Sequence, residues 1–91
     1  MKSKYRVNIV YHTDVVNTYR ERQLRSLATT FGGEEYGAGY GWGYRDIQFG
    51  GFKTEEIAQN FFSRAMRYKS LKWIKRLCYV EKDIVSTEDF Y

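Results

Sequence analysis

The run YGAGYGWGY at residues 36–44 constrains this chain more than any other stretch. Every odd position in the run is glycine, and every even position except Ala38 is aromatic. A β-strand directs alternate side chains to opposite faces, so extended chain here would carry its rings on one face and bare backbone on the other. Because glycine weakens strands and favours turns, we expect the turn within residues 36–41 and Tyr40 and Trp42 near a hairpin tip.

Two segments before this run predict a strand and a helix. In residues 4–11, β-branched and aromatic residues alternate with mostly polar ones, which is typical of a strand. Residues 15–30 carry apolar side chains at helical spacing. Thr13 or Asp14 is expected to cap this helix by accepting from its free N–H groups.

The hairpin itself should span residues 34–52, with a short strand near 34–38 and a stronger one at 43–50. In the second strand Arg45 shares a face with Ile47 and Phe49, and these two apolar residues should be buried. The opposite face, which carries Tyr44, is polar and suits an open side of a sheet.

A second helix is expected over residues 55–68, with Thr54 as its cap and a wide apolar stripe along one side. Residues 72–81 favour a strand because Trp, Ile, Tyr and Val are frequent there, although a helix remains open for residues 71–80. The domain should occupy residues 1–81, followed by an acidic tail over 82–91.

This order of elements, β-α-β-β-α-β, predicts the fold. Two right-handed β-α-β crossovers on one sheet give a ferredoxin-like βαββαβ sandwich. The expected α+β domain has a four-stranded antiparallel sheet with both helices on one face and the other face open.

The net charge and the cysteine content indicate the kind of partner and the cellular compartment. The 91 residues carry a net charge of +4, which suits an acidic or polyanionic partner. Cys78 is the only cysteine, so a reducing compartment is expected. The N-terminus has no apolar signal run and no segment reaches the length of a membrane span, which favours a cytoplasmic protein without membrane contact.

Few residues offer catalytic or metal chemistry. His12 is the only histidine and cannot build a structural zinc site with one cysteine. His12 and Asp14 follow the first strand, where Asp14 resembles in position the aspartate of compact CRISPR-associated nucleases with a ferredoxin-like fold. A capping role already accounts for Asp14, so we expect no catalysis, no metal and no cofactor.

Residues 42–49 partly resemble the RNP1 octet of RNA-recognition-motif domains. Gly43, Tyr44, Ile47 and Phe49 match that octet, and the match falls on the third predicted strand. The resemblance implies that Tyr44 stacks on a base. Trp42, Arg45 and Asp46 depart from the octet.

Three interpretations of the aromatic run remain open: sheet packing, a stacking platform for single-stranded nucleic acid, and an anchor for a protein partner. We expect a non-catalytic interaction module that binds and modulates or inhibits a macromolecular partner, as small phage accessory proteins do. The alternative is an RNA or single-stranded DNA binder, and a homodimer through the open face or an edge strand is also expected. The candidate partner-binding residues are Tyr36, Tyr40, Trp42, Tyr44, Arg45, Arg6 and Lys75.

Overall fold

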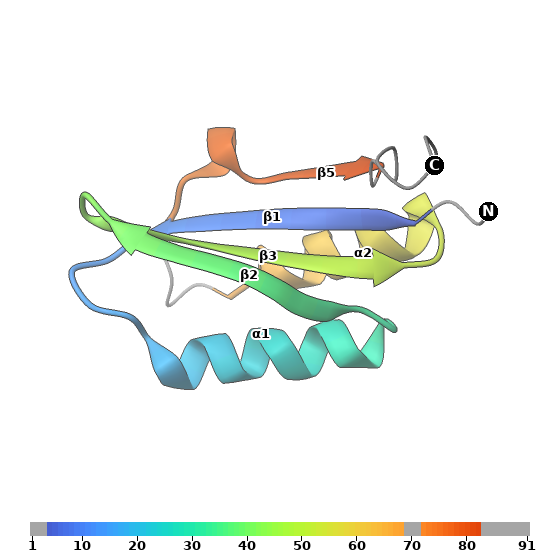
Figure 1. Cartoon of the computed structure of the whole chain (residues 1–91), viewed down its shortest axis with the longest axis horizontal. Coiled ribbons are helices and arrows are strands. Elements are labelled where there is room, and N and C mark those ends of the chain that lie inside the picture. The colour runs from blue at the N-terminus through green and yellow to red at the C-terminus, as the bar shows by residue number, and fades with distance from the viewer. Residues whose placement is uncertain (1–3, 69–71, 83–91) are drawn as a thin grey trace, which may run out of the picture.

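The computed structural model describes residues 4–68 and 72–82. These residues form an α+β domain with two helices and an antiparallel sheet (Figure 1). The elements are β1 (Tyr5–His12), α1 (Thr18–Thr30), β2 (Glu34–Gly41), β3 (Tyr44–Phe52), α2 (Glu55–Ala65), β4 (Lys72–Trp73), the 3₁₀ turn η1 (Lys75–Leu77) and β5 (Tyr79–Lys82). The expected α+β class is therefore confirmed.

The sheet has the strand order β2-β3-β1-β4, and β5 also pairs with β1. All of these pairings are antiparallel. β4 lies opposite Tyr11 and His12, whereas β5 lies opposite residues 5–8, so together they act as one interrupted outer strand. This arrangement is compatible with the expected ferredoxin-like fold.

The strand predicted over residues 72–81 is wrong in its middle, where η1 interrupts it. Ile74 N donates to the carbonyl of Val10 at 2.9 Å, and Val10 N donates to Sγ of Cys78 at 3.2 Å. Cys78 Sγ thus accepts the hydrogen bond from Val10 N that a main-chain carbonyl would accept in a regular pair of strands. Val10, Ile74 and Cys78 are buried together, and this local packing replaces the regular ladder.

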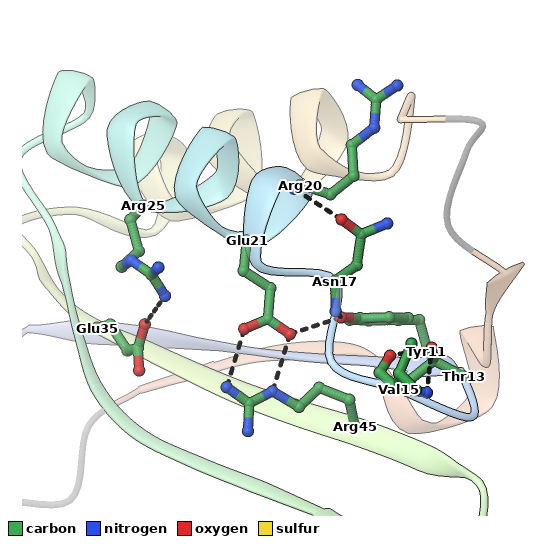
Figure 2. A network of polar contacts seen from close by, with 9 residues as sticks. All are labelled: Tyr11, Thr13, Val15, Asn17, Arg20, Glu21, Arg25, Glu35 and Arg45. Atoms are coloured by element: carbon green, nitrogen blue, oxygen red, sulfur yellow. Dashed lines mark hydrogen bonds and ion pairs between the residues drawn. The ribbon is translucent and has the colours of Figure 1, made fainter.

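One core lies between the sheet and both helices, and Figure 2 shows the two helices above the same face of the sheet. Ile47 and Phe49 are fully buried in it, as expected. The ring of Phe61 lies 5.1 Å from that of Phe49 and 5.0 Å from that of Phe52, measured between centroids. The other buried members are Val7, Ile9, Tyr11, Leu24, Ala28, Ala58 and Ala65.

The helix boundaries differ from the expectation at two ends. α1 begins at Thr18 and is capped by Asn17, whose Oδ1 accepts from Arg20 N at 3.0 Å, so capping by Thr13 or Asp14 is wrong. The cap of α2 is confirmed, because Thr54 Oγ1 accepts from Ile57 N at 3.1 Å. α2 ends at Ala65, three residues earlier than expected. Of the predicted tail, only Lys82 is described, and residues 83–91 lie outside the described residues.

Candidate binding surface at the hairpin tip

β2 and β3 are joined by a two-residue turn, Trp42-Gly43, and not by a turn within residues 36–41. Both residues have positive φ, 57° for Trp42 and 81° for Gly43. This is the pattern of a type I′ turn, in which Asn-Gly is the favoured pair because a larger side chain is strained in that conformation. Trp42 is also 96% exposed. A bulky ring therefore stands at a strained position without any packing in the described chain that explains it.

The loop between β1 and α1 lies against this end of the hairpin (Figure 1). Thr13 N donates to the carbonyl of Gly43 at 3.0 Å, and the hydroxyl of Tyr40 donates to the carbonyl of Asp14. Val15, in the same loop, is 70% exposed. Val15, Tyr40 and Trp42 thus form an exposed apolar group at one end of the domain, which we call the tip surface.

A buried polar network beneath the tip surface holds α1 to the sheet (Figure 2). Glu21, on α1, is 1% exposed and receives two hydrogen bonds of 2.8 Å from the guanidinium of Arg45 on β3. The hydroxyl of Tyr11 donates to the same carboxylate at 2.5 Å and accepts from Asn17 N at 3.3 Å. Since Asn17 also caps α1, the network links the helix start to two strands.

The network also changes the acidity of its members. Burial, and then the hydrogen bond to Glu21, raise the pKa of Tyr11 to about 12. The hydrogen bond to Glu21 likewise raises the pKa of Arg45. Arg45, a candidate partner-binding residue, is thus engaged on the helix side of the sheet. Glu21 was missed in the sequence, although Glu21, Leu24 and Ala28 share one face of α1, and a core-facing arginine needs a carboxylate.

The aromatic residues of the run do not share one face, contrary to the expectation from their alternation. A bulge in β2 between Glu35 and Gly37 shifts the register. Independently of this bulge, the register of the two-residue turn sets Tyr40 opposite Arg45, on the helix side, whereas Tyr44 lies opposite His12, on the open side. Tyr36 lies on the open side at the far end of the hairpin, where its hydroxyl accepts from Nη1 of Arg6 at 3.0 Å.

The open face holds a shallow cavity of about 190 Å³. Tyr36 and Tyr79, each about half exposed, lie on β2 and β5 at its two sides. Nε of Arg6 lies 2.9 Å from Oε1 of Glu81, and Nδ2 of Asn8 donates to the carbonyl of Leu77 at 3.1 Å. The lining residues are Arg6, Val7, Asn8, Tyr36, Gln48, Tyr79 and Glu81.

No family model, curated protein or solved structure matches this chain.

The remaining candidate residues are separate from the tip surface. Lys75 is exposed on η1, which lies at one edge of the sheet, whereas β2 forms the other edge. His12 is exposed at the end of β1 and Asp14 is exposed in the loop after it. Burial raises the pKa of the Cys78 thiol, which lies within the fold.

The described part of the chain shows neither a metal-binding group nor a membrane-spanning helix. Residues 4–68 and 72–82 bring no three His, Cys, Asp or Glu side chains together in a group that could hold a metal ion. Within the same residues, neither helix has the length and apolar character needed to cross a membrane.

Proposed function

We propose that this chain is a ferredoxin-like βαββαβ domain that acts by binding and not by catalysis. The element order and the strand order β2-β3-β1-β4 support the fold, if β4 and β5 are taken together as its last strand. Fold alone does not specify a function, which has to be argued from a site.

The proposed function is to bind a protein partner through the tip surface and to modulate or inhibit that partner. The observation that carries this proposal is Trp42, which is 96% exposed and has a φ of 57°. Backbone strain costs stability and is concentrated at functional sites, and exposed apolar groups mark sites of interaction. Tryptophan is also among the residues that most often dominate binding energy at protein interfaces.

The surroundings of Trp42 favour a rigid anchor over a flexible loop. The Tyr40 hydroxyl donates to the carbonyl of Asp14, next to Val15, and Thr13 N donates to Gly43 of the turn, so two hydrogen bonds tie this end of the hairpin to the β1–α1 loop. The network of Glu21, Arg45 and Tyr11 joins α1, β3 and β1, the elements that adjoin the β1–α1 loop and the turn. A preorganised turn backbone of this kind lowers the conformational entropy that is lost when a partner binds.

Site-specific photo-crosslinking in cells of the source organism tests this function. A photoreactive phenylalanine derivative at position 42 should give a discrete adduct with one protein, whereas the same group at the exposed Gln59 on α2 should not. The partner identified by mass spectrometry should then bind the purified wild-type chain. Equal adducts from both positions, or none from position 42, would contradict the proposal.

The cavity on the open face favours a second candidate function, the binding of RNA or single-stranded DNA. Tyr36 and Tyr79 could stack on bases, at about 1–3 kcal/mol per base, and the amides of Asn8 and Gln48 lie between them. Fluorescence anisotropy with mixed-sequence single strands should then show binding that weakens with salt and is lost in Tyr79→Ala but kept in Trp42→Ala. A flat titration at low salt excludes this candidate.

A further inference from the structure

β2 forms one edge of the sheet, and among residues 4–68 and 72–82 it pairs only with β3. Ala38 and Tyr40 on this strand are exposed although their cross-strand partners, Ile47 and Arg45, lie on the helix side. The helices therefore do not cover β2 at Ala38 and Tyr40. An edge strand of this kind is a template for pairing with another strand.

The hairpin geometry decides which backbone groups of β2 face outward. Gly41 and Tyr44 flank a two-residue turn, so they form a pair that exchanges hydrogen bonds between β2 and β3. Hydrogen-bonded pairs alternate along an antiparallel ladder, so Gly39 and Gly37 also face β3. The N–H and C=O groups of Ala38 and Tyr40 must then point away from β3.

Gly39 lies at the centre of the regular part of β2. It begins after the bulge at residues 35–37 and ends before the turn at Trp42, so it covers residues 37–41. We propose that this segment pairs with the same segment of a second copy of the chain, antiparallel and around a two-fold axis at Gly39. Ala38 then exchanges hydrogen bonds with Tyr40 of the second copy, and Tyr40 with Ala38, which uses every outward group of the segment.

The side chains of the segment fit this register. On the open face, Gly39 meets Gly39 of the second copy, and Gly41 meets Gly37. These are pairs without mutual hydrogen bonds, in which Cα atoms approach to about 4.5 Å. On the helix side, each Tyr40 ring lies beside the small Ala38 of the other copy.

Gly41 supplies an independent reason for the pairing. A Cβ on Gly37 would lie 2.7 Å from Oε1 of Gln48, and a Cβ on Gly39 would lie 2.6 Å from Oδ1 of Asp46, so side chains of the same copy already lie over these two glycines. At Gly41 a Cβ would meet nothing within 4 Å, and its φ is not positive. In the paired register Gly41 faces Gly37 of the second copy, where the Gln48 amide of that copy occupies the space.

A pairing of five residues per strand buries little surface, so the dimer should be weak. The net charge of +4 on each copy opposes association, and salt should strengthen the dimer by screening this repulsion. The second copy is bound through backbone groups of β2. This inference therefore does not depend on the protein partner of the tip surface.

Sedimentation velocity of the full chain from about 10 µM to 1 mM, the range of weak dissociation constants, tests the pairing. Wild type should shift from monomer to dimer mass, and so should the control Gln59→Ala. Ala38→Pro removes an outward N–H, and Gly41→Val adds a side chain at a position where a Cβ meets nothing within 4 Å in the monomer. Both variants should stay monomeric while keeping wild-type circular dichroism.

Hydrogen exchange gives a second readout that needs no substitution. As concentration rises, the amide hydrogens of Ala38 and Tyr40 should exchange more slowly, whereas that of Gly39 should change little because it already faces β3. A wild-type chain that stays monomeric at every concentration would overturn the proposal. Dimers of both Ala38→Pro and Gly41→Val with wild-type affinity would overturn it as well, since the interface would then lie elsewhere.

Discussion

The carboxylate of Glu21 and the guanidinium of Arg45 form a two-point ion pair, with 2.8 Å at each contact, between α1 and β3. Glu21 is 1% exposed, and the hydroxyl of Tyr11 donates to it as well. The carboxylate thus receives three hydrogen bonds in a site that water hardly reaches. This contact ties the helix that begins beside the tip surface to the strand that carries the hairpin.

Removing the carboxylate should destabilise the chain strongly. Glu21→Ala leaves Arg45 and the Tyr11 hydroxyl without their acceptor and should lower the free energy of unfolding by about 3 kcal/mol. Adding Arg45→Ala should cost less than the sum of the two single changes, with a coupling of about 1–3 kcal/mol. Urea unfolding of the full mutant cycle measures this. Additive effects, or a loss from Glu21→Ala no larger than that from the exposed Gln59→Ala, would show that the pair does not hold α1 in place.

The raised pKa of Tyr11 predicts a loss of stability at high pH. The folded chain holds the phenol proton up to about pH 12, whereas an unfolded chain releases it near pH 10.0. The stabilising contribution is therefore fully present below pH 10.0 and is lost as the pH rises to about 12. The stability advantage of wild type over Tyr11→Phe should shrink across this window by up to about 3 kcal/mol. An advantage that stays constant across the window would contradict the raised pKa of Tyr11, which burial and then the hydrogen bond to Glu21 cause.

Strong local signals were enough to predict the supporting elements. Thr54 followed by the apolar stripe of α2 predicted that helix and its cap, and the alternation in residues 4–11 predicted β1. The buried pair Ile47 and Phe49 on β3 followed from the two-residue period of a strand. These features depend on residues close together in the chain, which is why periodicity alone could find them.

The candidate surface depended on details that local patterns do not carry. Four glycines within residues 36–44 make several turn positions acceptable, and Trp42-Gly43 lacks the Asn-Gly signature of its turn type. The bulge at residues 35–37, which moves Tyr36 to the open face, has no mark in the sequence. The break between β4 and β5 arises because Ile74 and Cys78 pack on Val10, a contact across more than sixty residues.

The strained turn predicts a substitution that stabilises the fold. Trp42→Asn places a residue that tolerates positive φ at the first turn position and should raise the free energy of unfolding by about 1 kcal/mol. Thermal or urea unfolding measures the change. Trp42→Val serves as the opposite control, because a β-branched residue is disfavoured at this φ. If Trp42→Asn is less stable than wild type, Trp42 is held in place by packing and is not a strained, exposed anchor.

Two glycines should respond oppositely to the same substitution. A Cβ on Gly33 would lie 2.5 Å from two ring atoms of Phe52, which is fully buried and cannot move aside. Gly33→Ala should therefore cost about 2–3 kcal/mol of stability through overpacking. Gly41→Ala, where the new methyl group meets nothing, should be neutral or stabilising by up to about 1 kcal/mol in dilute solution. Equal effects of the two changes on urea unfolding would mean that Phe52 does not pack as described.

The dissociation constant of the complex with the protein crosslinked at position 42 decides whether the tip surface is the binding site. Isothermal titration should compare wild type with Trp42→Ala and with the exposed control Gln59→Ala, all of which should keep the wild-type fold. We predict that Trp42→Ala weakens binding by about 2 kcal/mol or more, roughly thirty-fold, and that Gln59→Ala binds as wild type does. Wild-type affinity in a folded Trp42→Ala chain would contradict the assignment of the tip surface as the binding site.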